Sequence, residues 1–305
     1  MSSEKFFTTK KALITLIAAS LVVIVSLGIR QTFGLFFFDF NADLNISISH
    51  FGFVIGLQLL MWGVFSPIFG FITDRYGGAT AIFIGFLFYL AGLFLFYSGL
   101  NTGYLFTLTI GLLIGIGLGG TAISIPVSVV AKHFPSSNRT IATGIVTCAG
   151  SFGFFVSPLL VRYSLIEIGW EITILYFCFL LGIGLITALF ISTPKASVEN
   201  NDTNNQSAKE ALIEAFNNKS FIFLTLGFFV CGWHIALVAT HIPTYMMDRG
   251  MPDWTAAMIL ALVGVFNMIG TMGSGYLATK FSKKKVLSAI YLLSCLLYTS
   301  PSPRD

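Results

Sequence analysis

The sequence predicts an all-α integral membrane protein, and two observations carry that prediction. Of the 305 residues, 55% are apolar and only 10% are charged, whereas soluble domains carry roughly 25% charged residues. The apolar residues fall in blocks of about 20, which cross a hydrocarbon core of roughly 30 Å as helices, rather than in the alternating segments of about 10 typical of membrane barrels. We therefore expect a bundle of transmembrane helices.

The apolar blocks predict eight complete spans and part of a ninth. The first block follows Lys5, Lys10 and Lys11 and is longer than the 7–15 apolar residues of a secretory signal, so we expect it to be retained. The expected spans are 12–38, 51–72, 81–99, 104–131, 141–161, 172–192, 220–242, 256–278 and the partial 286–297. They divide into an amino-terminal six-helix half (1–193), a linker (194–219) and an incomplete carboxyl-terminal half (220–297).

Three polar or amphipathic segments lie outside the predicted spans in the second part of the chain. The Asn-rich stretch 199–205 cannot bury enough apolar surface to order itself and is expected to be a linker. Ser207 and Glu210 have capping-box spacing before an apolar run, which predicts a short amphipathic helix at the membrane surface. At the other end, 298–305 changes abruptly to Ser and Pro, and we interpret it as a non-native tail on a carboxyl-terminally truncated fragment.

The positive charges predict the orientation in the membrane. Loops on the amino-terminal side carry 13 Lys and Arg residues, against only Arg162 and Arg249 on the other side. Because positive loops stay in the cytoplasm, the amino terminus and the linker are expected there, in a plasma (inner) membrane. Trp170 and Trp254 would then lie at the outer interface, where amphipathic rings are favoured.

The composition argues against several other classes. The positive residues are spread over loops, so we expect no nucleic-acid partner. The four cysteines lie inside apolar blocks with no pair spacing, and Cys231 with His234 supplies only two candidate ligands, so no metal site or other cofactor is predicted. An intramembrane enzyme would need a nucleophile and a base within the spans, which this sequence lacks.

A short charged turn follows the second span and returns in degenerate form after the eighth. The two copies read GFITDRYGG (70–78) and GYLATKFSKK (275–284). A repeated six-helix unit with this turn resembles the major facilitator superfamily of secondary transporters. Gly78 and Ala79 stand where that family has basic residues, and the second copy has lost its Asp. The residues matching the motif are Gly70, Asp74, Arg75 and Gly77.

Four further stretches resemble the monocarboxylate and oxalate/formate branch of that family. They read RQTFGLF (30–36), QLLMWG (58–63), HIPTY (241–245) and NMIG (267–270). The family resemblance implies a twelve-span fold in two halves, with a small-molecule site between them. It also implies that Asp74 interacts with the amino-terminal end of a helix in the opposite half, a geometry that favours an anion. That partner is usually span eleven.

Arg30 is the only Lys or Arg inside a predicted span, and all 13 Asp and Glu residues lie outside the spans. A charge at that depth is costly unless it faces a cavity or a partner. We hypothesise that Arg30 receives a substrate carboxylate, for which a guanidinium offers a bidentate fork. The alternatives are that Arg30 snorkels to the outer interface, pairs with Asp39 or Asp43, or fixes helix packing.

Other polar residues within spans are weaker candidates for the same site. Gln58 and Trp62 share a helix face in span two and could line the cavity; alternatively, Gln58 is buried by an interhelical hydrogen bond and Trp62 is its packing neighbour. The same alternatives apply to Asn267 in span eight. His234 and His241 lie two helical turns apart in span seven and could carry a proton near neutral pH, or be structural. The predicted substrate-binding set is Arg30, Gln58, Trp62, His234 and Asn267, with His234 and His241 as proton-coupling candidates.

The predicted function is secondary active transport of a small, monocarboxylate-like organic anion by alternating access, as proton symport or anion exchange. Its partners would be the lipid bilayer, the substrate and protons. The alternatives are a transporter-like membrane receptor without net transport, and a transporter of a non-anionic small solute.

Overall fold

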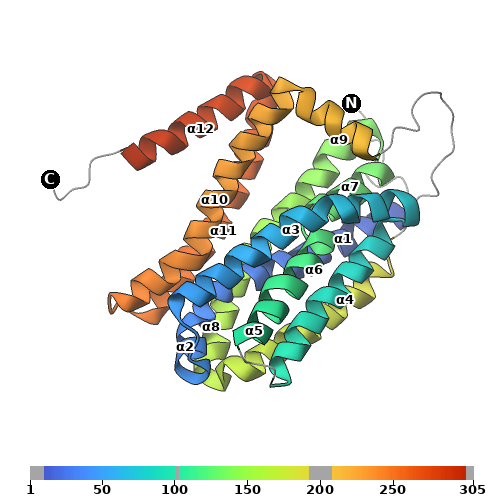
Figure 1. Cartoon of the computed structure of the whole chain (residues 1–305). Helices are drawn as coiled ribbons and strands as arrows, with labels where there is room; N and C mark the ends of the chain where they lie inside the picture. The colour runs from blue at the N-terminus through green and yellow to red at the C-terminus, as the bar shows by residue number, and fades with distance from the viewer. Residues whose placement is uncertain (1–9, 100–102, 192–207, 300–305) are drawn as a thin grey trace.

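The computed structural model describes residues 10–99, 103–191 and 208–299, whose regular structure is entirely helical (Figure 1). The predicted all-α fold is therefore confirmed. Along the first half of the chain the elements are α1 (Lys10–Gln31), η1 (Phe33–Phe36), α2 (Phe37–Leu44), α3 (Ile48–Tyr76), α4 (Gly78–Tyr97), α5 (Gly103–Phe106), η2 (Thr107–Leu113), α6 (Ile114–Thr121), α7 (Ser124–His133) and α8 (Ser136–Ala188). The later elements are α9 (Ala208–Asn217), α10 (Lys219–Asp248), α11 (Asp253–Lys280) and α12 (Lys283–Thr299).

Seven helical stretches of the described chain are long and apolar enough to cross a membrane. One of them, 138–188, is 51 residues long, far more than one crossing requires. It contains Gly169 at φ 79°, ψ 171°, which interrupts the helix between the predicted fifth and sixth spans. Figure 1 shows α8 reversing direction at this point, so the 53-residue element consists of two antiparallel helices.

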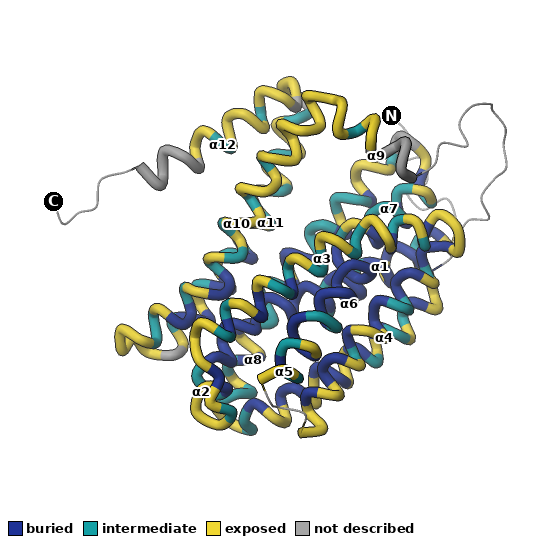
Figure 2. Tube along the Cα trace, viewed as in Figure 1, coloured by how far each residue is buried: buried dark blue, intermediate teal, exposed yellow. Residues whose placement is uncertain are grey.

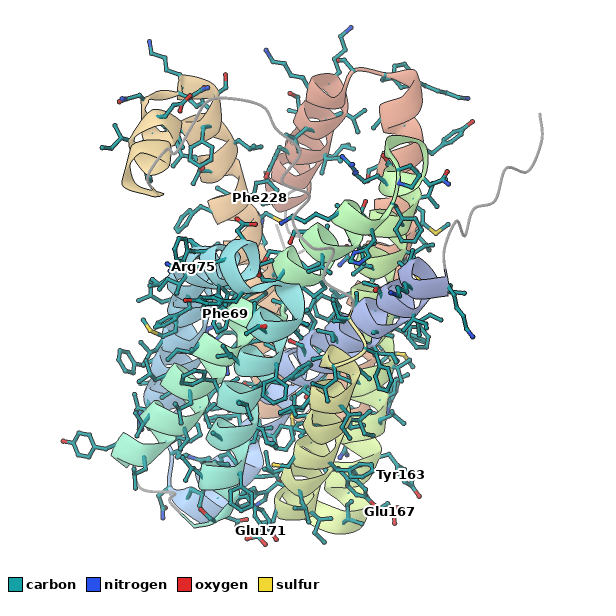
Figure 3. All side chains as sticks on the ribbon, turned by 90° about the vertical axis from the view of Figure 1, so that its right-hand side faces the viewer. Phe69, Arg75, Tyr163, Glu167, Glu171 and Phe228 are labelled. Atoms are coloured by element: carbon teal, nitrogen blue, oxygen red, sulfur yellow. The ribbon has the colours of Figure 1, made fainter. Side chains whose placement is uncertain are left out.

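The loops alternate between the two ends of the bundle. Figure 3 shows Arg75 near one end of the bundle, while Glu167 and Glu171 lie at the other. We call these the Arg75 end and the Gly169 end. This is the relation expected when an odd number of crossings separates the two turns.

The first span is not one continuous α-helix. After Gln31 the chain tightens into the 3-10 segment η1, and the Thr32 hydroxyl donates to the Ile29 carbonyl at 2.8 Å. Gly34, inside η1, packs directly against the Ala239 carbonyl of α10. The irregular turn thus brings the first span against the second half of the chain.

The fourth span also departs from a simple helix. Its segment η2 is π-helical, with the Ile114 amide bonded to the Thr109 carbonyl five residues earlier. Further along, Ala122 leaves helical geometry at ψ −179°. A proline ring clashes with the carbonyl four residues before it, and Ala122 stands four residues before Pro126. The break therefore follows from the proline.

Glycines on the fourth span allow close packing against α3. A Cβ at Gly115 would lie 2.6 Å from the Gln58 carbonyl oxygen, and one at Gly119 would lie 2.9 Å from Phe65 Cβ. Small residues at four-residue spacing permit such an approach between transmembrane helices. This contact fixes the position of Gln58 relative to η2 and α6.

An aromatic cluster closes the Gly169 end of the first half. The Phe40 ring of α2 packs edge-on against Phe96, Phe106 and Trp170, with ring centroids 5.3–5.8 Å apart. The Trp170 indole nitrogen donates to an Asp43 carboxylate oxygen at 2.6 Å. Edge-to-face aromatic pairs contribute beyond area burial, at about 0.5–1.5 kcal/mol each. The cluster joins α2, α4, α5 and α8.

The second half meets the first mainly toward the Gly169 end. Buried residues of α10 begin at Ala239, and those of α11 lie between Ala256 and Gly264. A Cβ at Gly264 would lie 2.7 Å from the Phe154 carbonyl carbon of α8. Toward the Arg75 end, α10 and α11 are mostly exposed within the described chain, as Figure 2 shows.

Within the predicted linker, the chain forms α9, whose Ile213 and Phe216 side chains are exposed. Ser207, the expected helix cap, lies outside the described residues, as does most of the linker. Most of the predicted tail (298–305) is also outside them, and α12 extends to Thr299. The division into two halves, linker and tail stays a prediction.

Candidate functional site

Arg30 occupies the last turn of α1 and is only 4% exposed. Within the described residues, no acidic side chain forms an ion pair with Arg30, and its Nε has no hydrogen-bond acceptor. Of its proposed alternative partners, Asp43 accepts from Trp170, and Asp39 lines a small pocket with Arg162. The low exposure also argues against snorkelling to the interface. The guanidinium is therefore a buried cation without an acidic partner among the described residues.

A buried polar layer lies beside Arg30, between α1, α4 and α6. Thr121 Oγ1 donates to the Gly117 carbonyl at 3.0 Å, which leaves its oxygen to accept from Ser26 Oγ at 2.8 Å. The Tyr89 hydroxyl donates to the Ser26 carbonyl at 3.4 Å and lies within electrostatic range of Arg30. Sequence reasoning missed this layer, because hydroxyl-bearing residues are common in membrane helices and only tertiary packing brings these together.

Gln31 is a further residue that sequence reasoning did not select. It is 1% exposed, and neither its Nε2 nor its Oε1 has a hydrogen-bond partner within the described residues. The available signal was its position directly after Arg30 inside an apolar block. Buried amide atoms are normally satisfied, so this side chain needs an explanation.

Gln58 is fully buried and joins α3 to the π-helical segment. Its Nε2 donates to the Ile110 carbonyl at 2.9 Å, whereas its Oε1 has no partner within the described residues. Half of the amide thus performs the interhelical bonding considered as the alternative to a cavity role. The other half is an acceptor available to a donor, and π-helical turns often occur at functional sites.

Trp62 and Asn267 have different surroundings. Trp62 is half-buried and packs against two apolar clusters, one turn from Gln58. Asn267 is exposed, and its side-chain oxygen accepts from Thr271 on the same helix at 3.5 Å. The described chain therefore brings no contact between Asn267 and Arg30.

The two histidines of α10 also separate in their environments. His241 is exposed and lines a groove of about 220 Å³ between α10 and α3, opposite Gly52. His234 is half-buried, two turns toward the Arg75 end. Arg30 is not among the residues that line the groove containing His241. Their role in proton coupling stays a prediction.

The charged turn is built around Gly77. Gly77 adopts φ 96°, ψ 154°, and its amide donates to the Thr73 carbonyl at 3.0 Å, so the helix α3 ends there. This backbone region is essentially restricted to glycine. The next residue, Gly78, packs directly against the Val129 side chain of α7. By contrast, a Cβ at Gly70 would meet no atom within 4 Å.

Asp74 forms an ion pair within the first half. Its Oδ1 accepts from Lys132 Nζ at 2.9 Å, and both side chains are well exposed, at 74% and 52% respectively. Together they stand at one end of a groove of about 480 Å³ between α3 and α7, which is also lined by Ser66, Ser124 and Ser128. The anticipated contact of Asp74 with a helix of the opposite half stays a prediction.

We expect Asp74→Asn and Gly77→Ala to differ in their effects on stability. Exposed ion pairs contribute about 0–1 kcal/mol, so Asp74→Asn should change the free energy of unfolding by no more than that. Gly77→Ala forces a side chain into a glycine-only conformation and should cost about 1–3 kcal/mol. Equilibrium unfolding of both variants in detergent measures the difference; equal losses would contradict this account of the turn.

The fold and the site are those of a multi-pass α-helical membrane protein with a buried cation, Arg30, that has no acidic partner within the described chain. The family follows from comparison with known proteins. The model of the Major Facilitator Superfamily matches residues 19–300, and the chain belongs to that superfamily. The resemblance inferred from the turn at 70–78 is thereby confirmed at the level of the superfamily, whereas the monocarboxylate and oxalate/formate branch stays a prediction.

Relatives of known type are distant and longer than this chain. The chain is 24% identical over 294 residues to the agnestins efflux protein of Paecilomyces divaricatus, covering 95% of this chain and 65% of that protein. It is 24% identical over 270 residues to the hexuronate transporter of Bacillus subtilis, covering 83% and 63%. A crystal structure of a D-xylose-proton symporter shares the fold, with a TM-score of 0.61 and 16% identity over 88% of this chain and 69% of that one.

Proposed function

We propose that this protein is a secondary active transporter of a small organic anion, working by alternating access. The observation that carries the proposal is Arg30, a guanidinium that is 4% exposed and has no acidic partner within the described residues. A buried charge is strongly unfavourable unless it is paired. In a membrane protein, such a residue points to a substrate or ion pathway.

The chemistry of the guanidinium favours a carboxylate as its partner. A guanidinium binds carboxylates through two parallel charge-assisted hydrogen bonds, which a neutral solute cannot match. The hexuronate transporter, one of the relatives, is named for a sugar acid, which carries a carboxylate. In this proposal Gln58 and Trp62 line the site near Arg30, and His234 and Asn267 enter it in another state of the cycle.

The contacts between the halves support alternating access. Buried contacts join them toward the Gly169 end, through Gly34 and Gly264, while α10 and α11 are exposed toward the Arg75 end. Such an arrangement corresponds to one state of a transporter in which two halves rock around a site between them. We propose two alternative coupling modes. One is proton symport, with His234 or His241 carrying the proton, and the other is anion exchange.

Counterflow in liposomes tests the proposal. The protein is reconstituted into vesicles loaded with unlabelled lactate, oxalate or glucuronate, and uptake of the same labelled anion is followed. We expect label to accumulate only in vesicles that contain both the protein and an internal anion. If the protein is a proton symporter, a pH gradient that is acid outside should increase net uptake of the anion. If it is an anion exchanger, the same gradient should leave the rate of exchange unchanged.

Two results would favour the other functions. Binding of labelled anion without exchange would indicate a membrane receptor that keeps the fold. If labelled xylose were exchanged and no carboxylate were, the protein would be a transporter of a neutral solute. The name of the D-xylose-proton symporter describes a protein of that kind. Vesicles without protein are the control for passive leakage of each solute.

A further inference from the structure

Arg30 and Gln31, two consecutive residues at the end of α1, both carry buried polar atoms without partners. Gln31 is the more extreme of the two, because both of its amide atoms lack a hydrogen-bond partner within the described residues at 1% exposure. Leaving a buried donor and acceptor unpaired costs their full desolvation. A group that is not part of the described chain is therefore needed to satisfy them.

The residues on either side of Gln31 contact both halves of the chain. Gly28 and Gly34 lie three residues before and three residues after Gln31. Gly28 packs directly against Ser157 of α8, in the first half. Gly34 packs directly against Ala239 of α10, in the second half. Gln31 therefore lies, along the chain, between a residue that contacts α8 and a residue that contacts α10.

We propose that Gln31 is a specificity residue that binds the uncharged polar part of the substrate, while Arg30 binds its carboxylate. This inference rests on the proposed function and narrows its substrate class. An amide offers one donor group and one acceptor, and a hydroxyl is the smallest group that both accepts from Nε2 and donates to Oε1. The substrate class is therefore a hydroxylated carboxylate.

Simpler anions fit Gln31 less well. A plain monocarboxylate or an inorganic oxyanion presents acceptors only, so it could satisfy Nε2 but would leave Oε1 unpaired. Sites that hydrogen-bond a hydroxyl reject analogues lacking it, because the buried groups of the site are then left without partners. Gln31 should thus discriminate between acids that differ only in their hydroxyl groups.

The test compares binding of matched acids to the wild type and to Gln31→Met, a variant of similar length without the amide. The pairs are lactate with propionate and glucuronate with cyclohexanecarboxylate, and binding is measured to the purified protein in lipid nanodiscs. For at least one pair, we expect the wild type to bind the hydroxylated acid at least about 10-fold more tightly. In Gln31→Met the two acids of that pair should bind about equally, because binding of the hydroxylated acid weakens while binding of its analogue does not.

Ser20→Ala provides the matched control. Ser20 also lies on α1, and its buried Oγ likewise has no hydrogen-bond partner in the described part of the chain, but it is 11 residues away, or roughly 16 Å along the helix. Ser20→Ala should leave the preference for the hydroxylated acid unchanged.

If the wild type binds neither pair of acids, the proposed function is overturned together with this inference. Equal binding within both pairs, or the same preference in Gln31→Met, would overturn this inference alone and would indicate that water satisfies Gln31. Equal binding within both pairs by the wild type would overturn this inference even if Gln31→Met does not fold.

Discussion

Arg30→Met is expected to reduce carboxylate exchange by at least about 100-fold, because two charge-assisted hydrogen bonds worth roughly 1.5–3 kcal/mol each would be lost. The same change should leave the free energy of unfolding unchanged or raise it. Burying the guanidinium costs free energy that no acidic side chain offsets within the described residues, and replacing buried charges with apolar groups of similar volume is often neutral or favourable. Loss of function with retained stability is therefore the expected signature.

Counterflow and detergent unfolding of three variants measure this result. Arg30→Lys keeps the charge but loses the planar fork, so it should retain a small part of the exchange activity. Arg249→Met is the matched control, since Arg249 lies just after the exposed end of α10 and packs on the Tyr245 ring at 5.2 Å; it should exchange normally. Undiminished exchange of every carboxylate by Arg30→Met would remove Arg30 from the site. A large loss of stability would instead make Arg30 a structural residue.

Gly264→Leu is expected to disrupt the packing of the second half against the first. Even a Cβ at this position would lie 2.7 Å from the Phe154 carbonyl carbon and equally close to Phe155 Cα. These are backbone atoms of α8, which cannot move aside as a flexible side chain can. Overpacking of a tight contact typically costs about 1–3 kcal/mol, and a leucine here should exceed that range. We expect a lowered unfolding midpoint and little exchange.

The same helix supplies a control that separates packing from helix propensity. A Cβ at Gly270 meets no atom within 4 Å among the described residues. Gly→Ala changes improve helix propensity by up to about 1 kcal/mol, so Gly270→Ala should raise stability or leave it unchanged. Gly264→Ala should lower it. If the two alanine variants changed stability in the same direction and by similar amounts, close packing at Gly264 would not be the reason for its glycine.

Most of the fold could be predicted from composition and the length of apolar runs. Each apolar block is long enough to cross the membrane, and its backbone must bond internally there, so helices follow from the local sequence. Local irregularities were less accessible. The break before Pro126 has a local cause, and the reversal at Gly169 falls within the loop predicted between the fifth and sixth spans, whereas the π-helical segment η2 carries no comparable signal in the chain.

The candidate site divides in the same way. Arg30 was identifiable from sequence because a single cation in an apolar block is conspicuous whatever its neighbours. Gln31 was adjacent to it and passed over, since an amide can be satisfied in many ways. Only the packing of Gly28 and Gly34 against α8 and α10 indicates where Gln31 lies. Likewise, only the tertiary structure shows that Gln58 Nε2 bonds to the Ile110 carbonyl while Oε1 has no partner within the described residues.

The sequence by itself thus determined the helical membrane class, the charged turn at 70–78 and the single cation within the predicted spans, because each depends on solvation of short segments. The tertiary structure alone decided which polar atoms stay unpaired, that Asp74 bonds to Lys132, and that the halves meet mainly toward the Gly169 end. These features depend on contacts between segments far apart in the chain, for which local hydropathy carries no information.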